Sequence, residues 1–327
     1  MSTIKDIAQA AQVSPATVSR ILNQDMTLNV TPQTRQKVLD TAREMNYVKK
    51  KRSTRSSFTL GIVQWFSAQE EINDTYYLMI RQGIEDYCKS SGIYVIRTYK
   101  ADMGYEELLK DVDGLICIGK FCFEEISRLR NITDRILFLD MPVEDADLTT
   151  ITLDFHQAVT LVLSYLYDRG YRKIGFLSGR EYLDDQQLFP DERPDIFINF
   201  CRQHNIEYEP FLLEDSFTSD SGYRMMTSLI EKGNLPDAVF AASDLIAIGA
   251  LKALNDRGYE VPKDMALIGF DDLAIAGFTT PPLTTVHAPA YEMGYYGAQI
   301  LHQFNSFQTG CAMKIKLPCR LVKRESC

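Results

Sequence analysis

The sequence predicts a two-part α/β protein, in which a small helical head precedes a much larger body built on parallel sheets. Its 327 residues are enough for two or three domains. The first 58 residues hold ten Lys and Arg against four Asp and Glu, a net charge of +6, so the other 269 carry −15. From Thr59 onward, short apolar runs alternate with amphipathic stretches of helical length. A basic head on an acidic body favours contact between the head and a polyanion.

The composition is that of an ordinary globular protein, with 45% hydrophobic and 24% charged residues. No apolar run reaches the roughly 18 residues of a membrane-spanning helix, and Lys5 and Asp6 stand where a secretory signal has an apolar block. The seven cysteines are odd in number, widely spaced and without a Cys-x-x-Cys pair. We therefore expect a soluble cytoplasmic protein with reduced thiols, no metal and no membrane contact.

The first helix of the head is predicted from Thr3 and Asp6, whose spacing is like that of a capping box. The apolar residues of one helical face follow at Ile4, Ile7, Ala8 and Ala11. After a short break, Ser14 can cap a second helix that opens at Pro15, where a missing N–H costs nothing. Its inner face consists of Val18, Ile21 and Leu22.

A third helix is predicted from Thr31, which can cap it, and Pro32, which can open it. Its inward residues are Val38, Ala42 and Met45, and it should end near residues 46–47. Two short helices with a tight turn between them, closed by a third, form a helix-turn-helix.

The outward face of the second helix carries hydrogen-bond donors where a surface helix would be rich in Glu and Lys. These donors are Ser14, Thr17, Ser19, Arg20 and Asn23. Short polar side chains suit phosphate oxygens, and the long fork of Arg20 suits O6 and N7 of guanine in a major groove. The alternative is a small helical bundle with a polar face, which the net charge of +6 disfavours.

Two runs of the head, TIKDIAQAAQVSPATVSRILN and VTPQTRQKVLDTAREMNY, resemble the DNA-binding head of the LacI/GalR family of bacterial transcription regulators. The resemblance implies that Pro15, Ala16 and Arg20 read bases; Arg20 is the strongest reader, because the other two offer only shape and contact with a thymine methyl. It implies backbone contacts from Thr3, Ser14, Thr17, Ser19 and Asn23. Gln12 departs from the Gly that is usual in this turn, and a positive φ there would cost Gln on the order of 1 kcal/mol.

Residues 48–58 are predicted to form a basic linker that is disordered in the absence of DNA, because they lack an apolar face. Members of the family commonly form a hinge helix here, with a leucine that wedges into the minor groove. This linker lacks that leucine and is about four residues short. We therefore expect an electrostatic role without a leucine wedge.

The body is predicted to be a doubly wound α/β structure. Its expected buried strands are 60–66, 114–119, 135–140, 173–178, 238–243 and 266–272. Its longest expected crossover helices are 76–91, 155–169, 221–232 and 244–257. At 269 residues two lobes are expected, and ligands of such folds bind outside the carboxyl ends of the strands.

The runs LYDRGYRKIGFLSG, AVFAASDLIAIGALKALNDRGYEVPKDMALIGFDD and FTTPPLTTV resemble the effector-binding core of the same family, which is similar to periplasmic sugar-binding proteins. EINDTYYLMIRQGIE resembles most closely its galactose and β-galactoside repressors, including the evolved β-galactosidase repressor. The expected domains are a head and linker over 1–58 and an effector and dimerisation domain over 59–327. The latter would have a near lobe of about 59–154 and 289–316 and a far lobe of about 155–288 and 317–327.

A sugar site needs carboxylates and amides that accept from hydroxyls, an Arg that donates, and an aromatic face. Asp140, Ser243, Asp244 and Asp271 stand at the ends of predicted strands. By family position, Asp271 and Arg193 would hold hydroxyls, Phe217 would stack, Ser243 and Asp244 would line the far lobe, and Tyr76 the near lobe. The alternatives are a surface residue for Arg193, core residues for Phe217 and Tyr76, and a helix cap for Ser243 and Asp244. Asp140 has the weakest support.

Catalysis is not expected, because the four histidines are scattered and no nucleophile elbow, dinucleotide loop or Walker loop is present. No cofactor is expected. The sequence favours a homodimeric regulator on a palindromic operator, most simply a repressor of galactose or β-galactoside genes released by a sugar. The alternatives are a catabolite-type regulator controlled by a phosphocarrier protein or another metabolite, and a sugar-binding protein without a DNA function. The sign of the response, induction or corepression, is left open.

Overall fold

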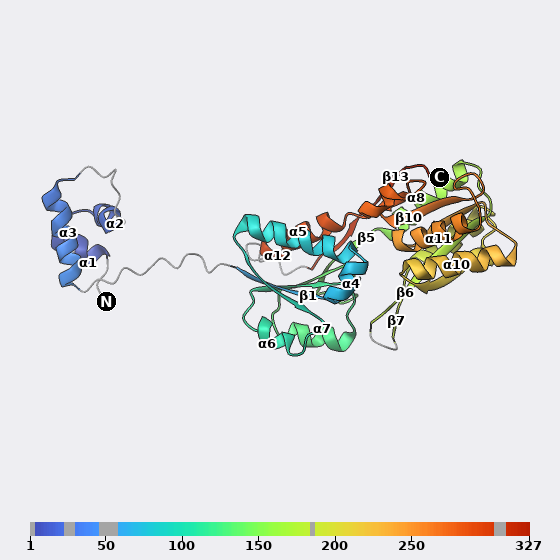
Figure 1. The fold of residues 1–327 in the computed structure, drawn as a ribbon. Helices are drawn as coiled ribbons and strands as arrows, with labels where there is room; N and C mark the ends of the chain where they lie inside the picture. Colours follow the sequence, from blue (N-terminus) through green and yellow to red (C-terminus); the bar gives the residue numbers. More distant parts are fainter. Residues whose placement is uncertain (1–3, 23–29, 46–57, 184–186, 304–311) are drawn as a thin grey trace. The chain divides into compact units, whose positions relative to one another are not determined.

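A computed structural model describes residues 4–22, 30–45, 58–183, 187–303 and 312–327. The chain forms two compact units, Met1–Ser56 and Ser57–Cys327. We call them the head and the body and describe each by itself (Figure 1). The expected linker at 48–58 lies outside the described residues except for Phe58, which is buried in the body.

The head consists of the three predicted helices, α1 (Ile4–Ala11), α2 (Pro15–Leu22) and α3 (Pro32–Glu44). Its buried core includes Ile7, Val18, Ile21 and Val38. Two of the expected caps are present: Ser14 Oγ accepts from the amide of Thr17 at 3.1 Å, and Thr31 Oγ1 from the amide of Thr34 at 3.2 Å. The expected cap of the first helix, Thr3, lies outside the described residues.

Gln12, in the turn between α1 and α2, has the positive φ that the family's usual glycine at this position suggested. Its φ is +58°, a conformation that favours glycine. The strain is confined to the turn, because the amide of the next residue, Val13, still donates to the carbonyl of Ala8 at 3.0 Å.

The near lobe of the body is a six-stranded sheet with neighbours in the order β12-β5-β4-β3-β1-β2, paired in parallel throughout. Its strands are β1 (Thr59–Gln64), β2 (Tyr94–Tyr99), β3 (Gly114–Ile118), β4 (Ile136–Leu139), β5 (Thr149–Leu153) and β12 (Lys314–Leu317). Its helices are α4 (Ala68–Asn73), α5 (Tyr76–Ser91), α6 (Tyr105–Leu109), α7 (Phe123–Arg130) and α12 (Ala290–Gln303).

The far lobe contains a sheet in the order β13-β11-β10-β9-β6-β7, with β8 also paired to β6. Its strands are β6 (Ile174–Tyr182), β7 (Leu188–Phe189), β8 (Leu212–Ser216), β9 (Ala238–Ala241), β10 (Ala266–Asp271), β11 (Thr284–His287) and β13 (Arg320–Val322). Only β7 and β13 pair antiparallel among these described strands. Its helices are α8 (Phe155–Asp168), α9 (Arg193–Gln203), α10 (Ser219–Lys232) and α11 (Asp244–Asp256), with 3-10 turns η1 (Glu209–Phe211) and η2 (Ala274–Phe278).

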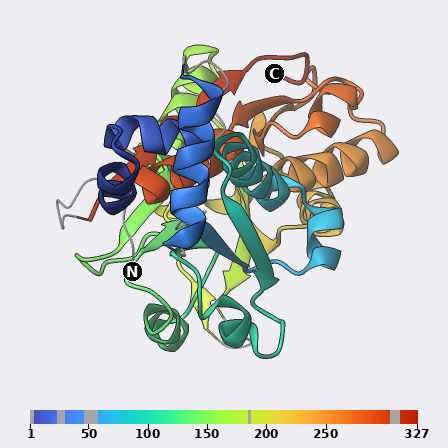
Figure 2. The same ribbon diagram turned by 90° about the vertical axis from the view of Figure 1, so that its left-hand side faces the viewer.

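Alternation along the strands supplies both faces of each sheet with apolar side chains. On β1, Ile62 faces the cluster that contains α5 and α12, whereas Val63 faces α6 and α7. On β6, Phe176 faces α8 and α9, whereas Leu177 faces α10 and α11. The paired helices α10 and α11 lie side by side in both views (Figures 1 and 2). The body is therefore two three-layer lobes, as the sequence predicts.

The chain passes between the lobes three times, after Leu153, after His287 and after Leu317. Helix α5 coincides with the predicted 76–91, and α8 and α11 end one residue earlier than predicted. Other elements differ more: α10 begins at Ser219 because Thr218 caps it, and β6 runs four residues past the predicted end at 178. Strands β1 and β9 each end two residues before their predicted ends. The three crossings and the doubly wound sheets place strand ends of both lobes around one space.

Candidate functional site

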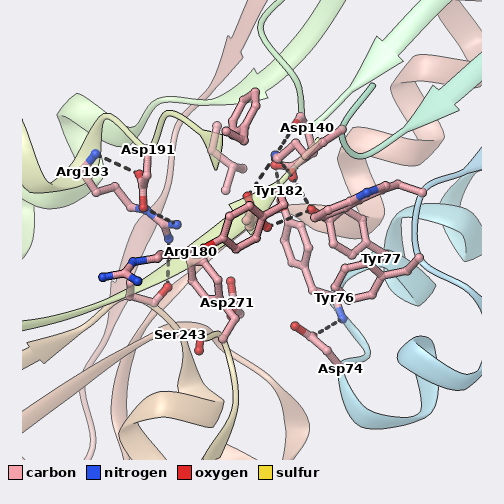
Figure 3. Close-up of a pocket in the computed structure, with 18 of the residues that line it drawn as sticks. Asp74, Tyr76, Tyr77, Asp140, Arg180, Tyr182, Asp191, Arg193, Ser243 and Asp271 are labelled. Carbon is pink, nitrogen blue, oxygen red and sulfur yellow. Dashed lines mark hydrogen bonds and ion pairs between the residues drawn. The ribbon is translucent and has the colours of Figure 1, made fainter. Parts of the chain in front are cut away.

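A cavity of about 1180 Å³ lies between the two lobes, where the carboxyl ends of their strands meet (Figure 3). Six of the seven residues expected in the effector site line it: Tyr76, Asp140, Arg193, Phe217, Ser243 and Asp271. Asp244 does not line it. The expected residues come from six different segments, and the fold brings them together.

The near-lobe wall is organised by Asp140, which directly follows β4 and is only 7% exposed. Its carboxylate accepts hydrogen bonds from Tyr76 Oη at 3.1 Å and Tyr77 Oη at 2.9 Å, and forms an ion pair with Lys120 Nζ at 2.8 Å. Its φ of +62° is a left-handed backbone conformation that turns the chain at the strand end. Three donors on one buried carboxylate fix its position at the cavity wall.

The two tyrosines stand at the start of α5, and both are buried. Burial and the charge of Asp140 raise the pKa of both phenols well above the ordinary value, so both remain hydrogen-bond donors. Just before them, Asp74 Oδ1 accepts from the amide of Tyr76 at 3.0 Å. Burial, and less strongly the charge of Asp140, raise the pKa of Asp74. Tyr76 thus has both roles considered for it, a buried residue that also lines the cavity.

The far-lobe wall is organised by Arg193, the first residue of α9, which is 7% exposed and so not the surface residue of the alternative reading. Its guanidinium pairs with Asp191 at 2.8 Å and donates to the carbonyl of Ala242 at 2.9 Å. It also lies over three aromatic rings, with its Cζ 4.7 Å from the centroid of Phe155, 5.3 Å from Phe217 and 5.5 Å from Phe270. The charge is therefore held between a carboxylate and an aromatic surface.

Phe217 directly follows β8, and its ring lies against Gly179 of β6. A Cβ at Gly179 would lie 2.3 Å from Cδ2 of this ring, so only glycine leaves room for it. Phe217 also contacts the apolar clusters on both faces of the far-lobe sheet. Its ring is partly packed in the core while lining the cavity.

Ser243 and Asp244 have different positions although they are adjacent. Ser243 lines the cavity, and its Oγ caps α11 by accepting from the amide of Ile246 at 3.2 Å. Asp244 is fully buried, accepting from Thr285 Oγ1 at 2.5 Å and from the amide of Leu273 at 2.7 Å. Burial raises the pKa of this carboxyl to about 7, although both hydrogen bonds lower it. Asp244 therefore supports the far-lobe sheet from inside and does not face the cavity.

Asp271 ends β10 with φ +106°, and Asp272 follows with φ +59°. Burial, and next the charge of Asp74, raise the pKa of Asp271 well above the ordinary value. The side chain of Asp272 instead pairs with Arg324 at 2.6 Å and with His287 at 3.1 Å. Two consecutive residues with positive φ strain the backbone here. This conformation directs the carboxylate of Asp271 to the cavity and that of Asp272 to Arg324 and His287.

In the head, the described residues of the expected DNA-contact set lie at the N-terminal cap of α2 and along this helix, with Arg20 in its last turn. Ser14, Pro15 and Arg20 are exposed, and Thr17 is half-buried, with its hydroxyl 2.8 Å from that of Ser14. The side chains of Ala16 and Ser19, and the whole of Thr3 and Asn23, lie outside what the structure describes. The described part presents two neighbouring hydroxyls, those of Ser14 and Thr17, and the exposed side chain of Arg20.

Known families and proteins match both units. Residues 3–50 match the model of the bacterial regulatory proteins of the lacI family, and residues 163–327 match the periplasmic binding protein-like domain. The regulator GalR of Lacticaseibacillus casei is 39% identical over 305 residues, which cover 92% of each chain. The repressor MelR of Bacillus subtilis is 34% identical over 337 residues, which cover 100% of this chain and 98% of MelR. The chain belongs to the LacI family. It is a DNA-binding transcription regulator.

Solved structures agree with this LacI-family assignment. A complex of the transcriptional regulator CelR with cellobiose has a TM-score of 0.72 at 26% identity and covers 100% of both chains. The operator-bound lac repressor dimer also has a TM-score of 0.72, at 24% identity, and covers 99% of this chain and 98% of its own, which shows the shared fold.

Several polar residues that line the cavity of this LacI-family chain were not predicted from the sequence, among them Asp74, Tyr77, Lys120, Glu181 and Asp191. Lys120 carried a usable signal, because it follows the apolar run of β3 just as Asp140 follows that of β4. Asp191 lies in a loop without a pattern. Within the described ranges no three His, Cys, Asp or Glu side chains could hold a metal ion, and no helix could span a membrane.

Proposed function

We propose that this LacI-family regulator represses genes of galactose or β-galactoside utilisation, and that a galactose-containing sugar releases it from a palindromic operator. The observation that carries the proposal is the pairing, in one cavity, of carboxylate acceptors with aromatic faces and a guanidinium. Asp140, Asp271 and Arg193 would bind sugar hydroxyls, and Phe217 would face the C–H side of the ring. The similarity to GalR and MelR supports a galactoside over other sugars.

The head supplies the DNA contact in this proposal. Arg20 would read a guanine, and Pro15 and Ala16 would contribute shape, while five residues would contact the backbone: Thr3, Ser14, Thr17, Ser19 and Asn23. Residues 1–58 would form the DNA-binding domain with its linker, and 59–327 the effector and dimerisation domain. Two heads of a homodimer would enter successive major grooves, as the two-fold symmetry of a palindrome requires.

Release by a sugar needs only a modest coupling between the two sites. A coupling free energy of about 1 to 3 kcal/mol lowers operator affinity roughly 5- to 150-fold. The sugar provides it if it binds one arrangement of the lobes more tightly than another. The three crossings between the lobes leave such a rearrangement possible without unfolding either sheet.

The experiment is a titration of the full-length protein on a fluorescent palindromic duplex selected in vitro, at fixed salt, with galactose, lactose and glucose. We expect galactose or lactose, and not glucose, to lower the anisotropy of the duplex. Tighter binding with sugar would contradict release, and indifference to all three sugars would contradict the galactoside assignment.

A further inference from the structure

A hairpin of the far lobe reaches the near lobe at the edge of the cavity. Strand β6 continues beyond its pairing with β8, which ends at Arg180, and turns back antiparallel into β7 (Figure 1). The carbonyl of Leu183 accepts from Lys100 Nζ of the near lobe at 2.6 Å. Phe189 of β7 packs against the near-lobe cluster under α6 and α7. The hairpin is thus a noncovalent connection between the lobes, additional to the three chain crossings.

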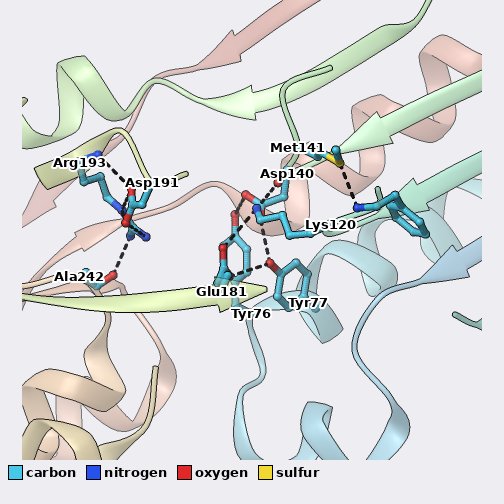
Figure 4. A network of polar contacts seen from close by, with 10 residues as sticks. Tyr76, Tyr77, Lys120, Asp140, Met141, Glu181, Asp191, Arg193 and Ala242 are labelled. Carbon is cyan, nitrogen blue, oxygen red and sulfur yellow. Dashed lines mark hydrogen bonds and ion pairs between the residues drawn. The ribbon is translucent and has the colours of Figure 1, made fainter. Parts of the chain in front are cut away.

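Lys120 stands where this hairpin meets the cavity wall (Figure 4). Its side chain is 5% exposed, and its ammonium group contacts Asp140 of the near lobe twice, at the carboxylate and at the backbone carbonyl. The same group lies 3.7 Å from Glu181 Oε2 and 4.7 Å from the centroid of the Phe189 ring, both on the hairpin. A buried ammonium group is costly unless such partners surround it, so its contacts on the two lobes are energetically linked.

Tyr77 joins the same two carboxylates. Its hydroxyl is 2.9 Å from Asp140 Oδ2 and 3.4 Å from Glu181 Oε1. A ligand hydroxyl that donates to Asp140 therefore competes with Lys120 and Tyr77 for that carboxylate. A hydrogen bond that Lys120 or Tyr77 no longer makes to Asp140 can be made to Glu181 instead. Occupancy of the cavity therefore changes how strongly the near lobe is bound to the hairpin.

We propose that Lys120 is a positioning residue that couples the effector site to the arrangement of the two lobes, by holding Asp140 of the near lobe and Glu181 of the far-lobe hairpin on one ammonium group. The inference rests on the proposed function, since it takes Asp140 as a sugar acceptor.

Thermodynamic linkage gives the coupling a signature that a purely local role lacks. A change that shifts the lobe equilibrium alters operator affinity without sugar and sugar affinity without operator in opposite directions. A residue that only binds sugar alters sugar affinity alone. A residue that only stabilises the fold lowers both affinities or neither.

The test compares Glu181→Gln, Lys120→Met and Lys120→Arg with the wild type. Glu181→Gln removes the charge of the interlobe contact and leaves the pair between Lys120 and Asp140 in place. Lys110→Met is the matched control, because Lys110 is exposed and pairs with Glu107 on the near-lobe surface. Sugar binding is followed by fluorescence of Trp65, the only tryptophan of the chain, which lines the cavity. Operator binding is followed by anisotropy, with galactose and lactose as the sugars.

We expect Glu181→Gln to change the two affinities at least threefold in opposite directions, and Lys120→Met to change them further. Lys120→Arg should lie between Lys120→Met and the wild type, and Lys110→Met should match the wild type. A change of sugar affinity alone, a joint loss of both affinities, or no change in Glu181→Gln would overturn the inference. If the wild type ignores both sugars, the proposed function fails, and an unaltered operator affinity of Glu181→Gln still overturns the coupling.

Discussion

The guanidinium of Arg193 meets the carboxylate of Asp191 through two nitrogens, with Nε 2.9 Å from Oδ1 and Nη2 2.8 Å from Oδ2. The third nitrogen, Nη1, donates to the carbonyl of Ala242. This arrangement fixes the plane of the guanidinium against the aromatic rings of the cavity, so Asp191 orients Arg193 without having been recognisable in the sequence.

Asp191→Asn should therefore lower sugar affinity about tenfold, since a charge-assisted pair contributes roughly 1.5 to 3 kcal/mol and part of it survives with the amide. Titration of Trp65 fluorescence with galactose measures it. Asp195→Asn, an exposed carboxyl on the same first turn of α9, is the control and should bind sugar as the wild type does. Equal affinities of the two variants would show that Arg193 does not depend on Asp191.

The packing of α5 on α12 predicts a large effect of one methyl group. A Cβ at Gly294 would lie 1.8 Å from the carbonyl oxygen of Ile80, and one at Gly83 would lie 2.0 Å from that of Tyr291. A backbone carbonyl cannot move out of the way of a new methyl group as the end of a flexible side chain can. Gly294→Ala should therefore destabilise the body by about 2 to 3 kcal/mol. Urea unfolding at constant pH measures this. Gly277→Ala is the control, because the nearest atom to its Cβ would be 3.9 Å away, and its stability should stay within about 0.5 kcal/mol of the wild type.

The left-handed turn of the head predicts a stabilising substitution. Gln12→Gly removes the steric cost of φ +58° and should stabilise the head by about 1 kcal/mol. Hydrogen exchange of buried α1 and α2 amides in the full-length chain should then slow about fivefold. Gln9→Gly, at an exposed position inside α1, should have the opposite effect, because glycine weakens a helix interior by about 1 kcal/mol. Faster exchange in Gln12→Gly would show that the turn does not strain glutamine.

Three of the cavity residues could be predicted from their place at the end of an apolar strand, since parallel strands place their carboxyl ends at one edge. Asp140, Ser243 and Asp271 were found in this way, whereas Tyr76, Arg193 and Phe217 were expected from the family resemblance alone. The same rule cannot give the direction of a side chain: Asp244 has an equivalent sequence position, yet its carboxylate turns inward to Thr285. Glu181 was missed because β6 continues past its apolar run, held by pairing with β7 that leaves no apolar signal.

The helices were predicted well where amphipathic periodicity is long, as in α5, or where a cap residue marks the start, as in α2. Helix α6 has only five residues, too few for a clear period. The glycine contacts between α5 and α12 could not be predicted, because they depend on which helices become neighbours across more than 200 residues of chain.

Arg20 is expected to read a base, and this predicts a specific pattern of lost affinity. Arg20→Ala should weaken operator binding by about 1 to 3 kcal/mol and relax the preference at one base pair of each half-site. Competition among duplexes with every single-base change, at fixed salt, measures it. Lys37→Ala, exposed on α3, should leave the base preferences unchanged. Uniform weakening on all sequences would make Arg20 a phosphate contact.

The buried carboxyl of Asp244 predicts a pH dependence of stability. Its pKa is raised by burial to about 7 in the folded protein and is about 4 in an unfolded chain. The folded state therefore binds more protons between these values, and the free energy of unfolding should fall as pH rises from about 4 to 7. The share of Asp244 is on the order of 3 to 4 kcal/mol over that range, and Asp271 contributes with the same sign because its pKa is also raised.

Asp244→Asn should reduce this fall of the unfolding free energy with pH, because the new side chain does not titrate. It should also lose one hydrogen bond, since the single oxygen of asparagine cannot accept from both Thr285 Oγ1 and the backbone N–H of Leu273 in the present geometry. The variant should be less stable than the wild type at pH 5 and closer to it at pH 7.5, by urea unfolding at each pH. Asp256→Asn is the control: hydrogen bonding to Lys252 lowers the pKa of Asp256, so this carboxyl is ionised in the folded and the unfolded chain throughout this pH range, and its loss should change the stability equally at pH 5 and pH 7.5. A wild-type stability that stays level or rises between pH 5 and 7 would show that Asp244 is ionised throughout, stabilised by its two donors against burial.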